Sequence, residues 1–303
     1  MKKVNYHESV LTHEVIDVLA HLKTQAQEKK VIDATLGTGG HTEALVKEGY
    51  FVLGIDLDPR MIEISRERLS LACPAPEQEL GRYILTHGNF KNIDEIAQKN
   101  NINQIDAVLM DLGVSNLHLK DEERGFSFGN PEAQLDMRID PSIQGLTAKD
   151  LLNVLREDQL RFLFERVLDP KDAKKIAQEI VMFRNGNKFQ TMSDFLEVCE
   201  SIKTKKGLNP ATLPLLALRI AVNSELENLK EALPKAFSML VSGGKMLVIT
   251  FHSGEEKVVV GYMRNMERLK VARFEEKAVK AGVEELERNI KARSAKLFVL
   301  TKK

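Results

Sequence analysis

Short apolar runs alternate with helical segments over residues 31–112, and this alternation limits the fold more than any other feature. The first run ends in a glycine-rich segment and the second ends at Asp56. The runs that read as strands are residues 31–34, 51–55, 83–86, 105–110, 245–251 and 296–300. Strands that alternate with helices are typical of βαβ units, in which a parallel sheet is covered on both faces. The sequence therefore predicts an α/β fold.

The alternation stops after the fourth run and resumes only near the end of the chain. Residues 114–143 are rich in Gly, Asn, Asp and Pro, a composition typical of long functional loops. The next sixty or so residues repeat apolar side chains at helical spacing. A chain of 303 residues suggests about two domains. We therefore predict a sheet domain made of residues 1–112 and 211–303. A mainly helical inserted domain, residues 113–210, interrupts it.

Composition excludes several classes of protein. Lys+Arg and Asp+Glu both number 44, so no overall positive charge points to a nucleic-acid partner, although an uneven distribution of charge would still allow one. Cys73 and Cys199 belong to no cluster of metal ligands, so we predict neither a metal site nor a disulfide. No apolar run approaches the ~20 residues of a membrane span, and the first residues do not form a secretory signal. The chain is predicted to be soluble, cytoplasmic and independent of membranes.

The segment Asp-Ala-Thr-Leu-Gly-Thr-Gly-Gly-His at residues 33–41 joins the first predicted strand to a helix. Glycines at such a turn let the backbone approach a ligand at the N-terminus of the helix. Asp33 precedes the glycines, and Asp56 closes the next strand. A carboxylate at the second position can accept hydrogen bonds from both hydroxyls of a ribose, each worth ~1.5–3 kcal/mol. The pattern favours S-adenosylmethionine, which carries an amino acid at one end and a ribose at the other.

Two other kinds of nucleotide-binding site are alternatives to an S-adenosylmethionine site. A dinucleotide-binding domain also has a ribose carboxylate at this place, but its third glycine would fall at Thr42. A phosphate-binding P-loop is excluded because the chain contains no G-x-x-x-x-G-K-[ST]. Ligands of such sheets lie beyond the carboxyl ends of the strands, so further contacts are expected after the third and fourth strands. Phe90 and Asp111 occupy these positions; Phe90 packs either on adenine or in the core.

A series of motifs resembles the bacterial 16S ribosomal RNA cytosine-N4 methyltransferases nearly from end to end. The order of the motifs is specific, whereas any one of them alone is not. The matching segments are residues 6–11, 33–41, 111–115, 124–128, 135–138, 217–223, 251–253 and 292–297.

The resemblance implies a Rossmann-like, class I methyltransferase sheet with an inserted helical substrate domain. It implies that the enzyme methylates a cytosine in the decoding centre, with 16S rRNA as partner, within the small ribosomal subunit; a homodimer is left open. The positions that match cofactor contacts of the family are Gly39, Gly40, His41, Asp56, Phe90, Asp111 and His118. His118 stands where glutamine is common. The chain also departs from the family pattern at Asn116 and at residues 213–216, 254–257 and 289–291, segments that are expected to face RNA.

Methylation of an exocyclic amine requires a group that accepts its N–H protons and holds it in line with the methyl donor. Alignment of this kind can contribute ~7–11 kcal/mol to catalysis. Asp111 is predicted to be this acceptor or a cofactor ligand, with Ser115 as a second acceptor. His252 ends the fifth strand, next to the fourth in the expected order, and is predicted to reach the acceptor base. Ser253 either shares that role or caps a helix.

Methylation at carbon 5 of cytosine would instead need a cysteine nucleophile. Neither cysteine lies in a predicted site, which favours methylation of the amine. Arg124, Phe126 and Phe128 combine a cation with two aromatic rings in a loop, a combination suited to RNA phosphate and an unpaired base but also found in ordinary loop packing.

Other contacts with RNA are less defined. Arg138 and Arg219 either contact phosphate or pair with nearby Asp136 and Glu225, and the basic tail at residues 288–303 either contacts the RNA backbone or is solvated. Two alternatives to the predicted enzyme stay open. One is a ribosome-assembly factor that binds S-adenosylmethionine with little transfer activity, and the other is a methyltransferase for a protein or small molecule.

Overall fold

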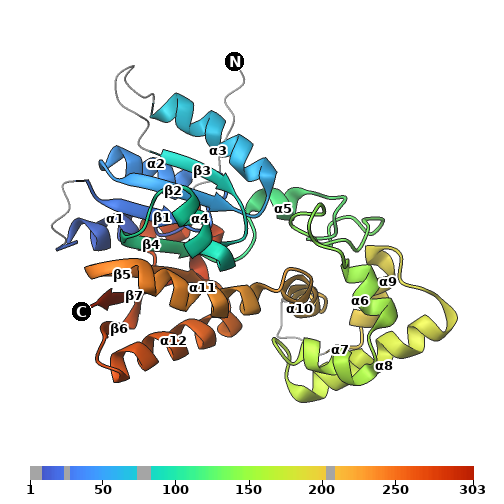
Figure 1. Ribbon diagram of the computed structural model, residues 1–303. Helices are drawn as coiled ribbons and strands as arrows, with labels where there is room; N and C mark the ends of the chain where they lie inside the picture. Colours follow the sequence, from blue (N-terminus) through green and yellow to red (C-terminus); the bar gives the residue numbers. More distant parts are fainter. Residues whose placement is uncertain (1–8, 24–27, 74–82, 203–208) are drawn as a thin grey trace. The chain divides into compact units, whose positions relative to one another are not determined.

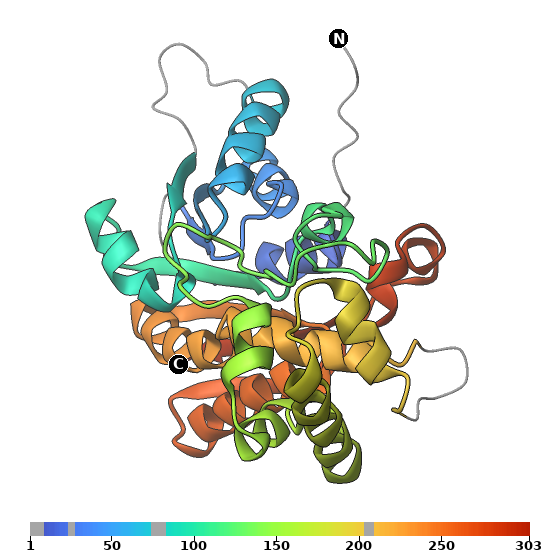
Figure 2. The same cartoon turned by 90° about the vertical axis from the view of Figure 1, so that its right-hand side faces the viewer.

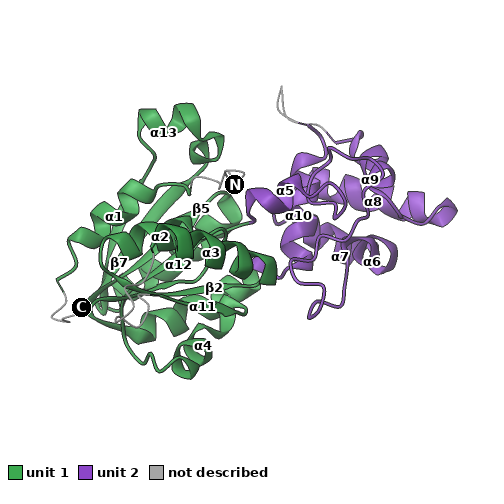
Figure 3. Cartoon of the chain, turned by 90° about the horizontal axis from the view of Figure 1, so that it is seen from above, with its two compact units in different colours: residues 1–113, 226–303 green, residues 114–225 purple. Residues whose placement is uncertain are grey.

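The computed structural model (Figure 1) describes residues 9–23, 28–73, 83–202 and 209–303. The first residues of the motif at 6–11, including Tyr6 and His7, therefore lie outside the described part. The chain divides into two compact units (Figure 3). Unit 1 combines residues 1–113 with residues 226–303, and unit 2 comprises residues 114–225. No helix in the described ranges has the length and apolar character needed to cross a membrane.

Unit 1 is built on a seven-stranded mixed sheet. Its strands are β1 (Lys30–Asp33), β2 (Phe51–Asp56), β3 (Tyr83–His87), β4 (Ile105–Asp111), β5 (Leu240–Thr250), β6 (Ala272–Val279) and β7 (Lys296–Lys302). Their order in the sheet is β3-β2-β1-β4-β5-β7-β6. The first five strands in this order are parallel, whereas β7 is antiparallel to both of its neighbours. The carboxyl ends of β1, β2 and β4 therefore meet at one edge of the sheet.

Helices cover both faces of this sheet because successive strand residues point to opposite sides. Ile32 packs into a core with α4, α11 and α12, whereas Val31 packs into a second core with α1 and α2 (Figure 1). The helical segments of unit 1 are α1 (Thr12–Ala20), α2 (Gly40–Lys47), α3 (Pro59–Ala72), η1 (Phe90–Asn92), α4 (Ile93–Lys99), α11 (Glu225–Met239), α12 (Ser253–Arg268), α13 (Val283–Arg288) and η2 (Ile290–Arg293). The predicted Rossmann-like class I sheet is confirmed.

Unit 2 is helical and has a hydrophobic core of its own, centred on Phe164, Phe189 and Phe195. Its helices are α5 (Asn116–Lys120), α6 (Ala148–Val154), α7 (Glu157–Phe164), α8 (Pro170–Gly186), α9 (Met192–Cys199) and α10 (Thr212–Val222). Figure 2 shows them from a second side, in green to light orange. The predicted insertion ended at residue 210, whereas unit 2 continues to Glu225. The difference arises because α10 buries Leu215 and Leu218 in the core of unit 2.

Two details of the sheet differ from the sequence-based expectation. The strand β6 was not predicted, because its centre is polar and exposed at Glu275, Glu276 and Lys277. The strand β5 begins at Leu240, whereas the sequence predicted a start after Gly243 and Gly244. Both segments lack the buried, uniformly apolar pattern by which the central strands were predicted.

Candidate active site

A glycine turn lies at the carboxyl end of β1 and leads into α2. Gly37 and Gly39 have φ angles of 53° and 78°, a left-handed conformation that favours glycine. The turn is fixed from within, because the Gly39 N–H donates to Leu36 O at 2.9 Å. No side chain caps α2. Among the described residues the N–H groups of Gly40 and His41 have no hydrogen-bond partner, so the start of this helix can bind a negatively charged group.

Asp56 ends the neighbouring strand β2 and is tied to the glycine turn. Its carboxylate oxygens accept hydrogen bonds from the N–H groups of Gly37 at 2.7 Å and Asp58 at 2.8 Å. Burial raises the pKa of Asp56 to about 7, although these two N–H donors favour the charged form. Each carboxylate oxygen keeps a further lone pair for a ligand hydroxyl. Asp56 can therefore both shape the turn and accept from a ribose.

His41 and Asp111 form a pair at the same edge of the sheet, in which His41 is buried and Asp111 is partly exposed. The ring Nε2 of His41 lies 3.5 Å from Asp111 Oδ2, and the side chain of His41 is 4% exposed. Burial favours the neutral ring, but the carboxylates of Asp111 and Asp33 outweigh it and raise the pKa of His41. Among the described residues, both ring nitrogens and Asp111 Oδ1 lack a hydrogen-bond partner. Buried polar atoms left unpaired in this way are costly unless a ligand or water satisfies them.

These orphaned atoms support a fit to S-adenosylmethionine. Its charged amino-acid end and its ribose both need polar partners, which the start of α2, the His41–Asp111 pair and Asp56 can provide. Phe90 begins η1 after β3; it is half-buried and packs against the first core. Phe90 thus packs against the core, one of the two roles that the sequence allowed. The exposed part of its ring stays available to an adenine ring.

Asp33, the carboxylate that precedes the glycines, has its hydrogen-bond partners within the protein. It is fully buried, and its oxygens accept from the Thr42 hydroxyl at 2.7 Å and the Thr35 N–H at 3.4 Å. Thr35 in turn accepts the Asp111 N–H at 2.6 Å through its hydroxyl oxygen. Thr35 and Thr42 were missed by the sequence analysis, and their only signal was their position on either side of the glycines. Asp33 thus supports the site from beneath rather than facing a ligand.

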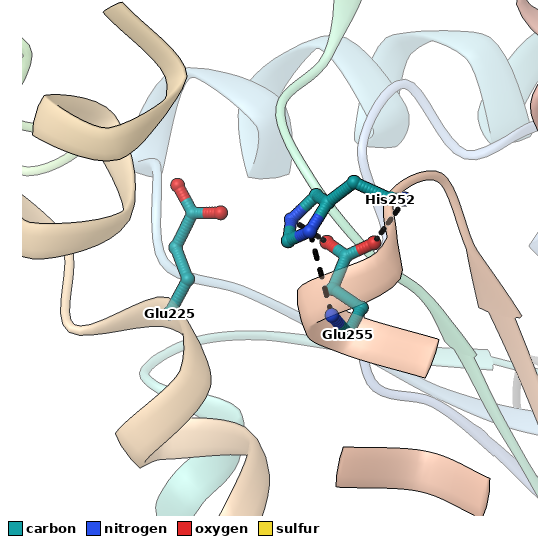
Figure 4. A group of neighbouring side chains, drawn as sticks. All are labelled: Glu225, His252 and Glu255. Atoms are coloured by element: carbon teal, nitrogen blue, oxygen red, sulfur yellow. Dashed lines mark hydrogen bonds and ion pairs between the residues drawn. The ribbon is translucent and has the colours of Figure 1, made fainter. Parts of the chain in front are cut away.

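His252 lies at the N-terminus of α12, after β5 (Figure 4). Its Nδ1 accepts from the N–H groups of Gly254 at 3.2 Å and Glu255 at 3.4 Å. The Glu255 carboxylate accepts the Phe251 N–H in return, at 2.8 Å. His252, not Ser253, is therefore the residue that caps the helix. Because β5 pairs with β4, His252 and Asp111 follow neighbouring strands of the sheet.

Ser115 and His118 belong to unit 2, where they bond to each other. The Ser115 Oγ and the His118 Nδ1 are 3.1 Å apart, and His118 Nδ1 also accepts the Ser115 N–H at 3.1 Å. Together they form the capping box of α5. His118 is buried, with its ring centroid 5.2 Å from that of Phe126. The assignments of Ser115 to catalysis and of His118 to cofactor binding stay predictions beside this local role.

The loop of unit 2 that was expected to face RNA is largely occupied by internal contacts. Phe126 is 4% exposed and packs in the core of unit 2, so its ring is not free to stack on a base. Arg124 donates to the carbonyl oxygens of Arg138 and Ile139. Phe128, in contrast, is 38% exposed. The loop-packing alternative is therefore observed for Phe126 and Arg124.

Several other basic residues considered for RNA contact are also paired: Arg138, Arg219, Lys296 and Lys302. Arg138 forms a bidentate pair with Asp136, in which both N–O distances are 2.8 Å. Arg219 pairs with Glu225 at 2.8 Å within unit 2. In the C-terminal tail, Lys296 pairs with a glutamate on α12, and Lys302 donates to carbonyl oxygens at the end of α11 and the start of β5. For Arg138 and Arg219 this is the pairing that the sequence left open, whereas Lys296 and Lys302 contact the fold itself rather than solvent alone.

Comparison with known proteins gives the family. The model described as the MraW methylase family matches residues 4–303. Three curated relatives are named ribosomal RNA small subunit methyltransferase H. The one from Dictyoglomus thermophilum is 37% identical over 296 residues, which covers 97% of this chain and 95% of the relative. The one from Hydrogenobaculum sp. is 39% identical over 296 residues, which covers 96% of this chain and 94% of the relative. The one from Persephonella marina is 37% identical over 300 residues, which covers 97% of this chain and 98% of the relative.

These matches extend over nearly the whole chain and both of its units, and they confirm the resemblance drawn from the motifs. The glycine turn, the His41–Asp111 pair and Asp56 lie inside the matched region. On this evidence the chain belongs to the MraW methylase family.

Proposed function

We propose that the protein transfers a methyl group from S-adenosylmethionine to the N4 amine of a cytosine in the decoding centre of 16S rRNA. The family and its relatives, named as methyltransferases of small-subunit ribosomal RNA, support an enzyme that modifies rRNA. The observation that carries the proposal is the pair of the buried His41 and the partly exposed Asp111, whose unpaired atoms lie beside the glycine turn at the carboxyl edge of the sheet. The cytosine N4 target rests on the motifs named above.

The chain's own groups divide the work of holding the cofactor. The start of α2 would hold the charged amino-acid end, because the N–H groups of Gly40 and His41 have no partner in the described chain. Asp56 would hold the ribose hydroxyls, and Phe90 would flank the adenine. The cofactor supplies an electrophilic methyl group on a sulfonium. Asp111, with its free Oδ1, would contact the cofactor or the acceptor amine.

Asp111 is the best placed orienting acceptor for the cytosine amine. The N4 lone pair is delocalised into the ring, so an acceptor that binds an N–H proton is needed to turn the amine towards the methyl group. The Asp111 backbone is fixed by its bond to Thr35, and its Oδ1 is unpaired within the described chain. His252 follows the neighbouring strand, and we propose that its ring contacts the base. Fixed geometry of this kind lowers the entropic cost of reaction.

The cysteines support methylation of the amine rather than of carbon 5. Cys199 is 1% exposed in the core of unit 2, and burial raises its pKa far above the ordinary value. Cys73 follows α3, which runs from the carboxyl end of β2 back towards the start of β3. The Cys73 thiol lies 4.0 Å from the carbonyl oxygen of Glu43 in α2. The buried Cys199 thiol is not placed to act as a nucleophile.

Transfer from labelled S-adenosylmethionine to undermethylated 30S subunits, with the product nucleoside identified by mass spectrometry, tests the proposal. N4-methylcytidine at a single decoding-centre position is the expected product. Another methylated nucleoside would refute the target, and cofactor binding without transfer would favour an assembly factor. Modification of ribosome-free substrates would favour a protein or small-molecule methyltransferase. The cytoplasmic location and the homodimer stay predictions.

A further inference from the structure

The helix α3 contacts the backbone of the glycine turn with two polar side chains. The Ser65 hydroxyl donates to the carbonyl oxygen of Gly37 at 2.9 Å. One turn further along α3, Arg68 Nη1 donates to the carbonyl oxygen of Thr38 at 3.3 Å. These are the carbonyls of two successive peptide groups in the turn. Neither Ser65 nor Arg68 was singled out by the sequence motifs.

Arg68 also links the turn to the helix that follows it. Its Nε lies 2.6 Å from Glu43 Oε2, in the first turn of α2, and Glu43 binds Lys47 as well. The side chains of Arg68 and Glu43 are only 15% and 17% exposed. Because the pair is shielded from water, its geometry is held more firmly than that of a surface ion pair. One arginine therefore fixes both the turn and the start of α2.

The close approach of α3 explains why the turn contains glycine. A Cβ atom on Gly39 would lie 3.0 Å from Ser65 Oγ, and one on Gly40 would lie 3.3 Å from Arg68 Nη1. A side chain at position 39 would therefore require Ser65 of α3 to shift, whereas at position 40 the nearest atom is Ser9 Oγ and the Arg68 side chain comes next. The glycines therefore allow contact with α3 on one side of the turn as well as with a ligand on the other.

The bond from Ser65 also determines where a neighbouring N–H points. In a trans peptide the C=O and N–H bonds are directed oppositely. When the Gly37 carbonyl points to α3, the N–H of Thr38 points away from α3. Within the described chain this N–H has no hydrogen-bond partner. The bond from α3 thus directs a donor towards the side of the turn where the cofactor is proposed to bind.

We propose that Ser65 and Arg68 are positioning residues for the cofactor: they hold the peptide groups of residues 37–39 in the orientation that binds S-adenosylmethionine, without contacting it. The inference rests on the proposed cofactor site. The same helix supplies matched controls on its outer face. Arg66 is exposed and pairs with Glu63, and the Ser70 hydroxyl donates to a carbonyl within α3.

Isothermal titration with S-adenosylhomocysteine on the full chain tests the inference. Ser65→Ala and Arg68→Met are expected to raise Kd about three- to tenfold, the loss expected for one or two hydrogen bonds. Arg66→Met and Ser70→Ala are expected to leave Kd unchanged. In assays on 30S subunits, KM for S-adenosylmethionine should rise for the first pair while kcat at saturation stays the same. Arg68→Lys, which keeps the charge but cannot bridge both partners, should fall between wild type and Arg68→Met.

A purely structural role predicts a different result. Ser65→Ala and Arg68→Met would then lower the melting temperature and kcat, through a smaller folded fraction, while Kd per folded molecule matched the controls. That outcome overturns the inference. If the wild type fails to bind S-adenosylhomocysteine, the cofactor proposal fails and the inference fails with it. If binding depends on Ser65 and Arg68 but no rRNA is methylated, the inference stands and only the proposed substrate fails.

Discussion

Cofactor affinity should depend on pH through Asp56. Burial raises the pKa of this carboxyl to about 7 in the free protein, so it is half protonated at neutral pH. A ribose hydroxyl donates to the ionised carboxylate, and such charge-assisted bonds are stronger than those to a neutral acid. The cofactor should therefore bind the ionised form, and its affinity should fall as pH decreases through about 7.

The size of the effect follows from the titration. Below the pKa, the ionised fraction falls tenfold for each pH unit, equivalent to about 1.4 kcal/mol. Kd should therefore be nearly constant above pH 8 and about thirtyfold higher at pH 5.5. Titration calorimetry with S-adenosylhomocysteine between pH 5.5 and 8.5 measures this slope directly.

The variant Asp56→Asn separates this effect from other titrations. It has no charge to lose, so its affinity should be lower at pH 8 and should lack the part of the slope that belongs to Asp56. Titration of the ligand or of His41 would affect both proteins equally. Equal slopes for the wild type and the variant would refute the assignment of Asp56 as the ribose acceptor.

Three further predictions concern stability and reactivity. Asp111→Asn removes a carboxylate that raises the pKa of His41 and so stabilises the charged ring. The urea midpoint of unfolding should therefore fall at pH 6, where the ring is charged, and change little at pH 9. Equal losses of stability at the two pH values would contradict this. Gly125→Ala should cost about 2 kcal/mol in chemical denaturation, because φ is 73° and the new Cβ would meet a backbone oxygen; a neutral change would contradict this. A thiol reagent should label Cys73 in the native chain and Cys199 only in denaturant, whereas two fast native thiols would contradict the burial of Cys199.

The central sheet could be predicted from the sequence because its strands are buried on both faces. Such strands appear in the sequence as short apolar runs, whichever elements surround them in the fold. The edge strand β6 carries Glu275, Glu276 and Lys277 at its centre and gives no such signal. The segment of α10 was predicted to belong to the sheet domain, because an apolar helix does not reveal which of two cores will bury it; Leu215 and Leu218 pack in the core of unit 2.

The candidate site was predictable where the chemistry depends on residue type and position along a strand. Asp56 and Asp111 lie at the same edge of the sheet because parallel strands place their carboxyl ends together, and His41 of α2 reaches Asp111 there. Local hydrogen bonding was not predictable, because it depends on backbone direction. The capping role of His252 and the burial of Phe126 are examples. A loop without periodicity does not indicate which of its aromatic residues points inward.

The position of β7 restricts the order in which the sheet can be assembled. β7 follows β6 in the chain but lies between β5 and β6 in the sheet, and it is the only strand that pairs with β6 among those described. During synthesis, β6 therefore leaves the ribosome before the strand to which it binds. Until β7 follows, β5 is an open edge and β6 has no place in the sheet. Insertion of β7 between its two neighbours therefore completes the sheet, and its removal would also leave β6 without its partner strand.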